Sequence, residues 1–244
     1  AEVYYSKRRY GEALGSLTQS LQLVDPCEQP ALEGKLYLHL GLVYRAMNDP
    51  NNALRSLRDG ANRLRAKRTG KEYETLLLFC IGTLYGESGK NDEARKFYTE
   101  AISVAKATGD RLAENYLYLF VAQTTEKLLP AQQKNFELEK RIQSFVQIAQ
   151  RFHECNHPTG EAFAYLQAGK LYESQEKLAE AREMYQRAVE LAPDLGDDVY
   201  FKLGNIAYKR SDREQAADLW RRALELNPKH ELVKANLDTL STLS

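Results

Sequence analysis

Two adjacent stretches of the chain repeat each other, and this internal repetition constrains the fold more than any other feature of the sequence. One reads YLQAGKLYESQEKLAEAREMYQRAVELAP from Tyr165, and the next reads YFKLGNIAYKRSDREQAADLWRRALELNP from Tyr200. They align almost without gaps at an offset of 35 residues, which separates Gly169 from Gly204. Repeats of this length are typical of solenoids, in which each repeat buries its apolar face against its neighbours. The other aligned residues include Ala181 with Ala216, Tyr185 with Trp220, Ala188 with Ala223 and Pro193 with Pro228.

Each aligned position has a physical reason. The glycine and the alanines predict two antiparallel helices that approach closely. The large residue, Tyr185 or Trp220, is expected to fill the space between neighbouring helix pairs. Pro193 and Pro228 predict the end of each second helix, because proline cannot continue a helix.

This pattern of an aromatic residue, Leu-Gly, Tyr, Ala, an aromatic residue, Ala and Pro resembles the tetratricopeptide repeat. Similar stretches begin at Tyr37, with Gly41, and at Leu78, with Gly82. The resemblance implies an all-α fold, a right-handed solenoid of antiparallel helix pairs with a C-terminal capping helix. It covers nearly the whole chain, which is therefore expected to be a single domain over residues 1–244.

The expected repeats differ in regularity. Where the glycine of the fourth unit should stand the chain has Gln123, and Pro130 suits the first turn of a long second helix. We therefore expect a degenerate repeat with a first helix over 111–129 and one continuous second helix over 131–152. The full set is a partial repeat at 1–26, repeats at 34–70, 75–108, 162–195 and 197–230, the degenerate repeat at 111–153, and a capping helix at 231–243.

Composition excludes several classes of function. Lys and Arg total 34 and Asp and Glu total 34, and this balance argues against nucleic-acid binding. No apolar run is long enough for a membrane span, so no direct membrane insertion is expected. The basic run from Arg63 to Lys71 is interpreted as the solvated end of a helix rather than a phosphate or import patch. Three cysteines without a pairing rhythm favour a reducing compartment, and cytoplasm is the expected location.

No catalytic, cofactor or metal site is expected. The segment Gly86–Lys90 resembles a phosphate-binding loop, but Leu84 stands where the first glycine belongs and Asn91 where Ser or Thr is needed. His153, Cys155 and His157, with Glu154, form a ligand-like cluster whose spacing does not suit zinc. A turn before a proline explains these residues as well.

The resemblance implies that the first helix of each pair lines a concave groove that binds a segment of another protein. Counting from each glycine gives an apolar row along these helices. The expected partner-binding residues are Leu38, Leu42, Leu76, Phe79, Leu117, Phe120, Phe163, Leu166, Phe201 and Asn205. Two other readings stay open: these side chains complete the core, or the chain's own helix 131–152 covers them.

One known activity of the family is not expected. The clamp that holds chaperone C-terminal carboxylates needs a lysine three residues before the glycine, where this chain has Phe201. The expected function is a non-catalytic scaffold that binds an apolar or amphipathic segment of a partner protein. The alternatives are a structural component of a larger assembly, including a homo-oligomer, or the regulatory part of a longer enzyme or transcription regulator. A small-molecule or lipid carrier ranks last.

Overall fold

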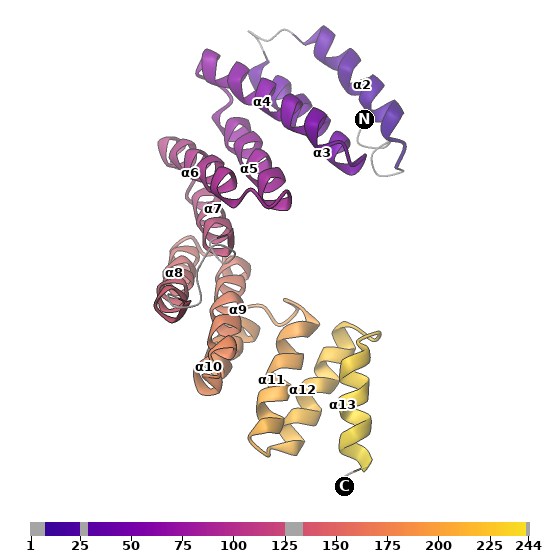
Figure 1. Ribbon diagram of the computed structural model, residues 1–244, viewed down its shortest axis with the longest axis vertical. Helices are drawn as coiled ribbons and strands as arrows, with labels where there is room; N and C mark the ends of the chain where they lie inside the picture. Colours follow the sequence, from indigo (N-terminus) through magenta and orange to yellow (C-terminus); the bar gives the residue numbers. More distant parts are fainter. Residues whose placement is uncertain (1–7, 25–28, 125–133, 243–244) are drawn as a thin grey trace. The chain divides into compact units, whose positions relative to one another are not determined.

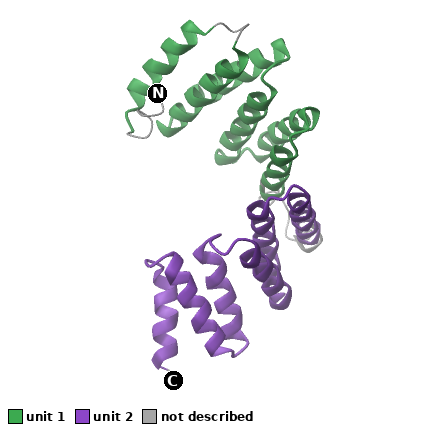
Figure 2. Ribbon diagram, turned by 180° about the vertical axis from the view of Figure 1, so that it is seen from behind, with its two compact units in different colours: residues 1–128 green, residues 129–244 purple. Residues whose placement is uncertain are grey.

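The computed structural model describes residues 8–24, 29–124 and 134–242. Within these ranges every regular element is an α-helix, which confirms the expected all-α class (Figure 1). The chain divides into two compact units, unit 1 over Ala1–Leu128 and unit 2 over Leu129–Ser244 (Figure 2). The single domain expected over 1–244 stays a prediction.

Unit 1 is built from helices that pack on their neighbours in sequence. They are α2 (Tyr10–Leu23), α3 (Pro30–Ala46), α4 (Pro50–Lys67), α5 (Lys71–Glu87), α6 (Asn91–Thr108) and α7 (Arg111–Thr124). The first helices α3, α5 and α7 also contact one another in this order. Of the first helix expected over 111–129, the part after residue 124 lies outside the described residues.

Unit 2 continues the same pattern. Its helices are α8 (Lys134–Glu154), α9 (Pro158–Ser174), α10 (Leu178–Leu191), α11 (Asp197–Lys209), α12 (Arg213–Leu226) and α13 (Glu231–Thr242). The long second helix expected over 131–152 corresponds to α8, which extends to Glu154, while residues 131–133 lie outside the described part. The expected capping helix corresponds to α13, and its buried residue is Val233.

Prolines and polar caps start several of these helices. Pro30, Pro50 and Pro158 occupy the first turn of α3, α4 and α9, where the missing N–H costs nothing. Asp49 caps α4 by accepting a hydrogen bond from the Asn52 N–H at 3.1 Å.

The short turns within pairs share one backbone geometry. Each contains a left-handed residue, namely Asn48, Gly89, Glu176 or Ser211. In each, the next residue's N–H bonds back five residues, as from Lys90 to the Tyr85 carbonyl, which satisfies the carbonyls at the helix end.

The turn between α8 and α9 has the same geometry, although the expected repeats place it between two pairs. Asn156 is left-handed there, and the His157 N–H bonds back to the Phe152 carbonyl at 3.0 Å. Phe152 packs directly against Gly160, where a Cβ atom would lie 2.5 Å from the ring. Helix α9 therefore belongs to two hairpins, one with α8 and one with α10.

The glycines of the repeats allow the close approach that the sequence predicts. A Cβ atom on Gly82 would lie 2.6 Å from Tyr98, and one on Gly169 would lie 2.5 Å from Tyr185. Leu57 faces Gly41 and Trp220 faces Gly204 in the same way. The large residue therefore packs inside its own pair, on the glycine. The expectation that Tyr185 and Trp220 also fill the space between neighbouring pairs stays a prediction.

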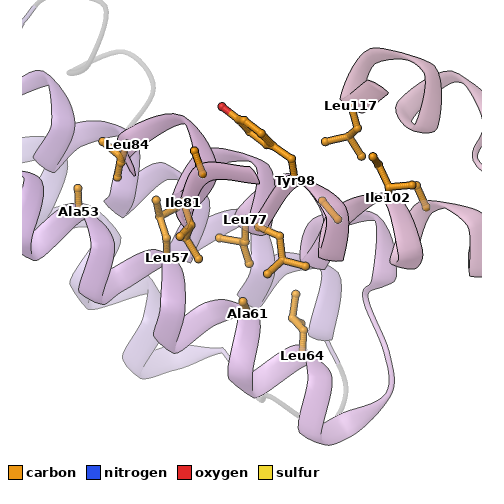
Figure 3. Packing of buried hydrophobic residues seen from close by; sticks show 14 residues of the cluster. Ala53, Leu57, Ala61, Leu64, Leu77, Ile81, Leu84, Tyr98, Ile102 and Leu117 are labelled. Atoms are coloured by element: carbon orange, nitrogen blue, oxygen red, sulfur yellow. The ribbon is translucent and has the colours of Figure 1, made fainter. Parts of the chain in front are cut away.

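The core of unit 1 lies between the paired helices (Figure 3). Leu57 and Leu64 of α4 and Leu77 and Ile81 of α5 are almost fully buried in one cluster. The cluster continues into α6 and reaches Leu117 of α7. Burial of such aliphatic side chains stabilises the fold by about 1.5–3 kcal/mol each.

The basic run is more than a solvated helix end. Glu33 and Glu74, in the first turns of α3 and α5, are 2% and 1% exposed. The Arg65 Nε atom lies 3.0 Å from a Glu74 oxygen, and Lys67 Nζ lies 2.9 Å from a Glu33 oxygen. Arg63 pairs with Glu33 and Lys71 pairs with Glu74 in the same way. These charges thus stand at the partly solvated end of α4, as interpreted, and in addition compensate buried carboxylates.

Candidate partner-binding face

Five residues of the expected apolar row lie on the first helices of unit 1 and are partly exposed. They form what we call the unit 1 row: Leu38 and Leu42 on α3, Leu76 and Phe79 on α5, and Phe120 on α7. Leu76 is 43% exposed and the others are half-buried. Leu38, Phe79 and Phe120 rest partly on the unit 1 core. They thus support the core and also present apolar surface.

The two phenylalanines form the most clearly ordered part of this row. Their ring centroids are 4.7 Å apart at an interplanar angle of 62°. This edge-to-face arrangement is a favourable one for aromatic rings. The structure therefore brings together the two aromatic residues that the sequence places on separate repeats.

Two expected residues are not at the surface. Leu117 is 3% exposed and Leu166 is 6% exposed. Leu117 points from α7 toward the α6 residues Tyr98 and Ile102 (Figure 3). Both leucines therefore serve as core residues, and the partner-binding face that we consider below leaves them out.

The polar groups beside the unit 1 row are satisfied within the chain. The Thr83 hydroxyl donates to the Phe79 carbonyl at 3.0 Å, and the Tyr98 hydroxyl donates to Thr83 Oγ1 at 3.4 Å. Arg45 of α3 pairs with Glu87 of α5, with 3.2 Å from Nε to the carboxylate. This face therefore offers mainly apolar surface.

Cys80 is next to Phe79 in sequence and has an inert thiol. Burial raises its pKa to about 11, and the nearby Arg45 guanidinium opposes the shift only partly. A thiol this rarely ionised at neutral pH is a poor nucleophile.

The first helices of unit 2 carry a different surface, in which charged residues pair between helices. Lys170 of α9 lies 2.9 Å from Asp198 of α11, and Lys202 of α11 lies 2.9 Å from Glu173 of α9. Phe163 is half-buried.

The other two expected residues of unit 2 make contacts with neighbouring helices. The half-buried Phe201 ring lies 4.8 Å from the His230 ring. The side-chain oxygen of Asn205 accepts from Trp220 Nε1 and from Asn236 Nδ2, each at 3.2 Å. Asn205 thus ties α11 to α12 and α13.

Sequence reasoning missed Tyr98 as a part of this region. Tyr98 occupies the packing position opposite Gly82, so its spacing assigns it to the core, where it is 2% exposed. Its ring nevertheless lies 5.8 Å from Phe79 and 6.3 Å from Phe120. The signal available in the sequence was that Phe79, Tyr98 and Phe120 are all aromatic and lie on three consecutive helices.

The two motifs set aside in the sequence have structural roles. Gly86–Lys90 forms the end of α5 and the turn into α6, with Gly89 left-handed. His157 caps α9 by accepting from the Gly160 N–H at 3.0 Å, and His153 lies 3.1 Å from Glu161. Among the described residues no group of His, Cys, Asp or Glu side chains is arranged to hold a metal ion. A search of these same residues finds no helix able to cross a membrane.

Comparisons with known proteins agree with the repeat pattern. Tetratricopeptide repeat models match residues 77–108, 164–195 and 197–230. The chain is 31% identical over 104 residues to the photosystem I assembly protein Ycf3 of Cyanophora paradoxa. That match covers 41% of this chain and 60% of the relative, so the chain spans less than two thirds of the relative's length.

Solved structures share the fold at low identity. BtubC (BKLC) from P. vanneervenii has a TM-score of 0.72 at 18% identity, covering 95% of this chain and 92% of that one. The apo form of RapI has a TM-score of 0.72 at 14% identity, covering 96% and 64%. MamA has a TM-score of 0.51 at 20% identity, covering 81% and 93%. The chain therefore contains tetratricopeptide repeats over the matched residues 77–108, 164–195 and 197–230, and it shares its helical fold with these solved structures.

Proposed function

We propose that this chain is a non-catalytic scaffold whose unit 1 row binds an apolar or amphipathic segment of a partner protein. Tetratricopeptide repeats indicate a protein-interaction scaffold, and proteins built from them are typically not catalytic. The finer proposal concerns the place and chemistry of binding on this chain. A single observation carries it: the unit 1 row is partly exposed while the polar groups beside it are already paired.

This combination favours an apolar ligand over a polar one. A partner's charged or hydrogen-bonding group would lose water on this face, where the Thr83 hydroxyl already donates to the Phe79 carbonyl and Arg45 already pairs with Glu87. An apolar side chain would lose only its unfavourable hydration. Phe79 and Phe120 present the rigid aromatic area that commonly anchors protein interfaces.

The name of the relative Ycf3 describes the assembly of photosystem I. For this chain we propose only the component shared with such a role, the holding of a partner protein. The regulatory and self-associating alternatives predict different behaviour of the isolated chain. Light scattering over a concentration series separates self-association, because the proposed function predicts a constant mass near 27.9 kDa.

The test uses affinity purification from native cells with quantitative mass spectrometry, comparing the wild-type chain with Leu76→Ser and with Phe79→Ser combined with Phe120→Ser. Leu76 is 43% exposed, so its substitution should reduce partner recovery with an almost unchanged melting temperature. The double variant should lose recovery almost completely, since each aromatic anchor contributes about 2 kcal/mol or more to binding. Some loss of stability is also expected, because both rings rest on the core.

Leu232→Ser is the matched control, because Leu232 is 63% exposed on α13 and lies outside the unit 1 row. It should leave both recovery and melting temperature unchanged. Full recovery of the partner by Leu76→Ser and by the double variant would move the binding site to another face.

A further inference from the structure

The residue that faces Gly82 from the second helix also touches the proposed partner-binding face. Tyr98 of α6 lies against Gly82 of α5, and its ring contacts Phe79 and Phe120 at centroid distances of 5.8 and 6.3 Å. It is 2% exposed, so it cannot itself meet a partner. Tyr98 thus supports the phenylalanine pair from beneath.

A hydrogen-bond chain adds a second link between Tyr98 and Phe79. The Tyr98 hydroxyl donates to Thr83 Oγ1, and the Thr83 hydroxyl donates to the Phe79 carbonyl. The Tyr98 ring therefore packs on the Phe79 ring, and the Tyr98 hydroxyl is linked through Thr83 to the Phe79 backbone carbonyl. The Tyr98 side chain, held through its ring and its hydroxyl, has fewer accessible rotamers, which preorganises the phenylalanine pair that rests on it.

The corresponding residues of other pairs can be compared with Tyr98. Leu57 faces Gly41 and has no polar atom. The Tyr185 hydroxyl donates to Glu173 at 2.7 Å, and Trp220 Nε1 donates to Asn205. Thr83 and Asn205 both stand one residue after the glycine, so two pairs share this contact, whereas the Tyr185 contact with Glu173 lies one turn further along its helix.

We infer that Tyr98 is a positioning residue that fixes the separation and tilt of Phe79 and Phe120, and through them the shape of the partner-binding face. This inference rests on the proposed function, since it assigns Tyr98 a role in binding through residues that it touches. It also explains why the pair stays edge to face although Phe79 and Phe120 belong to consecutive repeats. The specificity of the face is then set in part from the second helix.

The experiment introduces 4-fluorophenylalanine at position 120 and follows its ¹⁹F resonance in the full chain. Leucine already packs on a glycine in this chain, where Leu57 faces Gly41. The helix pair of α5 and α6 should therefore still form in Tyr98→Leu. Loss of the tyrosine ring should shift the resonance of position 120. Tyr98→Phe retains the ring and should keep the resonance close to that of the wild type.

The binding arm uses a fluorescein-labelled amphipathic peptide with leucines at helical spacing, titrated by fluorescence anisotropy. Tyr98→Leu should weaken peptide affinity about tenfold, and Tyr98→Phe about twofold or less. Thr83→Val, which cuts the hydrogen-bond chain at nearly constant volume, should weaken it about threefold and supplies a second variant if Tyr98→Leu folds poorly. Tyr185→Phe, in unit 2, is the matched control and should change neither readout.

The two arms separate the two possible failures. An unshifted ¹⁹F resonance in Tyr98→Leu overturns the positioning role whatever the peptide does. An unchanged peptide affinity in both Tyr98→Leu and Thr83→Val also overturns it. A wild-type chain that does not bind the peptide counts against the proposed function, while the resonance still decides whether Tyr98 positions the phenylalanines.

Discussion

At the scale of single residues, the repeats depend on pairs in which a large side chain fills the space left free by a glycine. Tyr98 occupies space that any Cβ atom on Gly82 would enter, and Tyr185 does the same above Gly169. Interiors packed to this density do not absorb an extra methyl group without moving side chains or backbone. A glycine elsewhere on the same helix has no such constraint.

Gly82→Ala should destabilise the chain by about 1–3 kcal/mol, because the new methyl group would lie 2.6 Å from Tyr98. Gly86→Ala is the control on the same helix, since its nearest neighbour would be 3.9 Å away. That substitution should be neutral or stabilising by up to about 1 kcal/mol, because alanine favours helix more than glycine does. Urea unfolding of both variants measures the difference, and equal effects at the two sites would contradict this account of the packing.

A second prediction at this scale concerns the Cys80 thiol, whose pKa burial raises from 9.0 to about 11. The unfolded chain loses this proton at lower pH than the folded chain does. The stabilising contribution is therefore complete below about pH 9 and is lost as the pH rises toward about 11. We expect a loss of about 1 kcal/mol by about pH 10.

The measurement compares the free energy of unfolding of the wild type and Cys80→Ser across this alkaline range. The difference between the two curves isolates Cys80 from the tyrosines and lysines that titrate in both proteins. Parallel curves would show that the thiol titrates equally in the folded and unfolded chains.

At the scale of elements, ion pairs join the ends of neighbouring helices. The charged residues can be read from the sequence, but their partners cannot. Arg65 of α4 contacts Glu74 of α5 and also Glu100 of α6, at 3.0 and 2.6 Å. One guanidinium therefore joins three helices. The negative charge of Glu74 also suits the positive end of α5, in whose first turn it lies.

Glu74→Ala should cost about 1.5–3 kcal/mol, because it deletes a carboxylate that is 1% exposed together with its charged hydrogen bonds to Arg65 and Lys71, which stay partly solvated. Glu72→Ala is the matched control, as Glu72 lies in the same first turn but is exposed. It should cost less than about 1 kcal/mol. Chemical denaturation monitored by circular dichroism distinguishes them, and similar small losses would mean that Glu74 adds nothing beyond its helix-dipole term.

At the scale of the whole molecule, the repeat signature was enough to predict an all-helical fold, because its spaced glycines, alanines and aromatics each specify a contact. Gly169 opposite Tyr185 and Gly204 opposite Trp220 are such contacts. The same reasoning could not predict that Leu117 is buried. Helical spacing gives the direction of a side chain but not which other residues cover that side chain.

Long-range pairing was the other feature beyond reach. A basic run has the same sequence whether its side chains face water or a buried glutamate. Glu33 lies 30 residues from Arg63, so the sequence does not show that the two pair. The α8–α9 hairpin escaped prediction for a related reason. Its glycine, Gly160, stands at the start of a helix rather than at the position that the repeat signature leads one to inspect.

Local stability within each unit gives a prediction for the full chain. In repeat proteins, stability is a sum of terms within repeats and between neighbours. Gly82→Ala should therefore speed amide hydrogen exchange in α5 and α6, and less so in α4 and α7, while α11 and α12 keep their wild-type rates. Gly204→Ala should do the reverse. A uniform rise along the chain, measured by mass spectrometry, would show one cooperative unit and support the single domain predicted from the sequence.

Because α9 packs in two hairpins, it restricts which helix pairs the chain could gain or lose. Because each repeat contacts only its neighbours, a helix pair can be gained or lost as a cassette where the packing on either side is kept. The pair α11–α12 is such a cassette, because Gly204 meets Trp220 inside it. Removal of α9 with α10 would strip Gly160 from Phe152 and leave α8 without the helix against which it packs. Recombination should therefore tolerate joints on either side of α11–α12 and avoid the joint between α8 and α9.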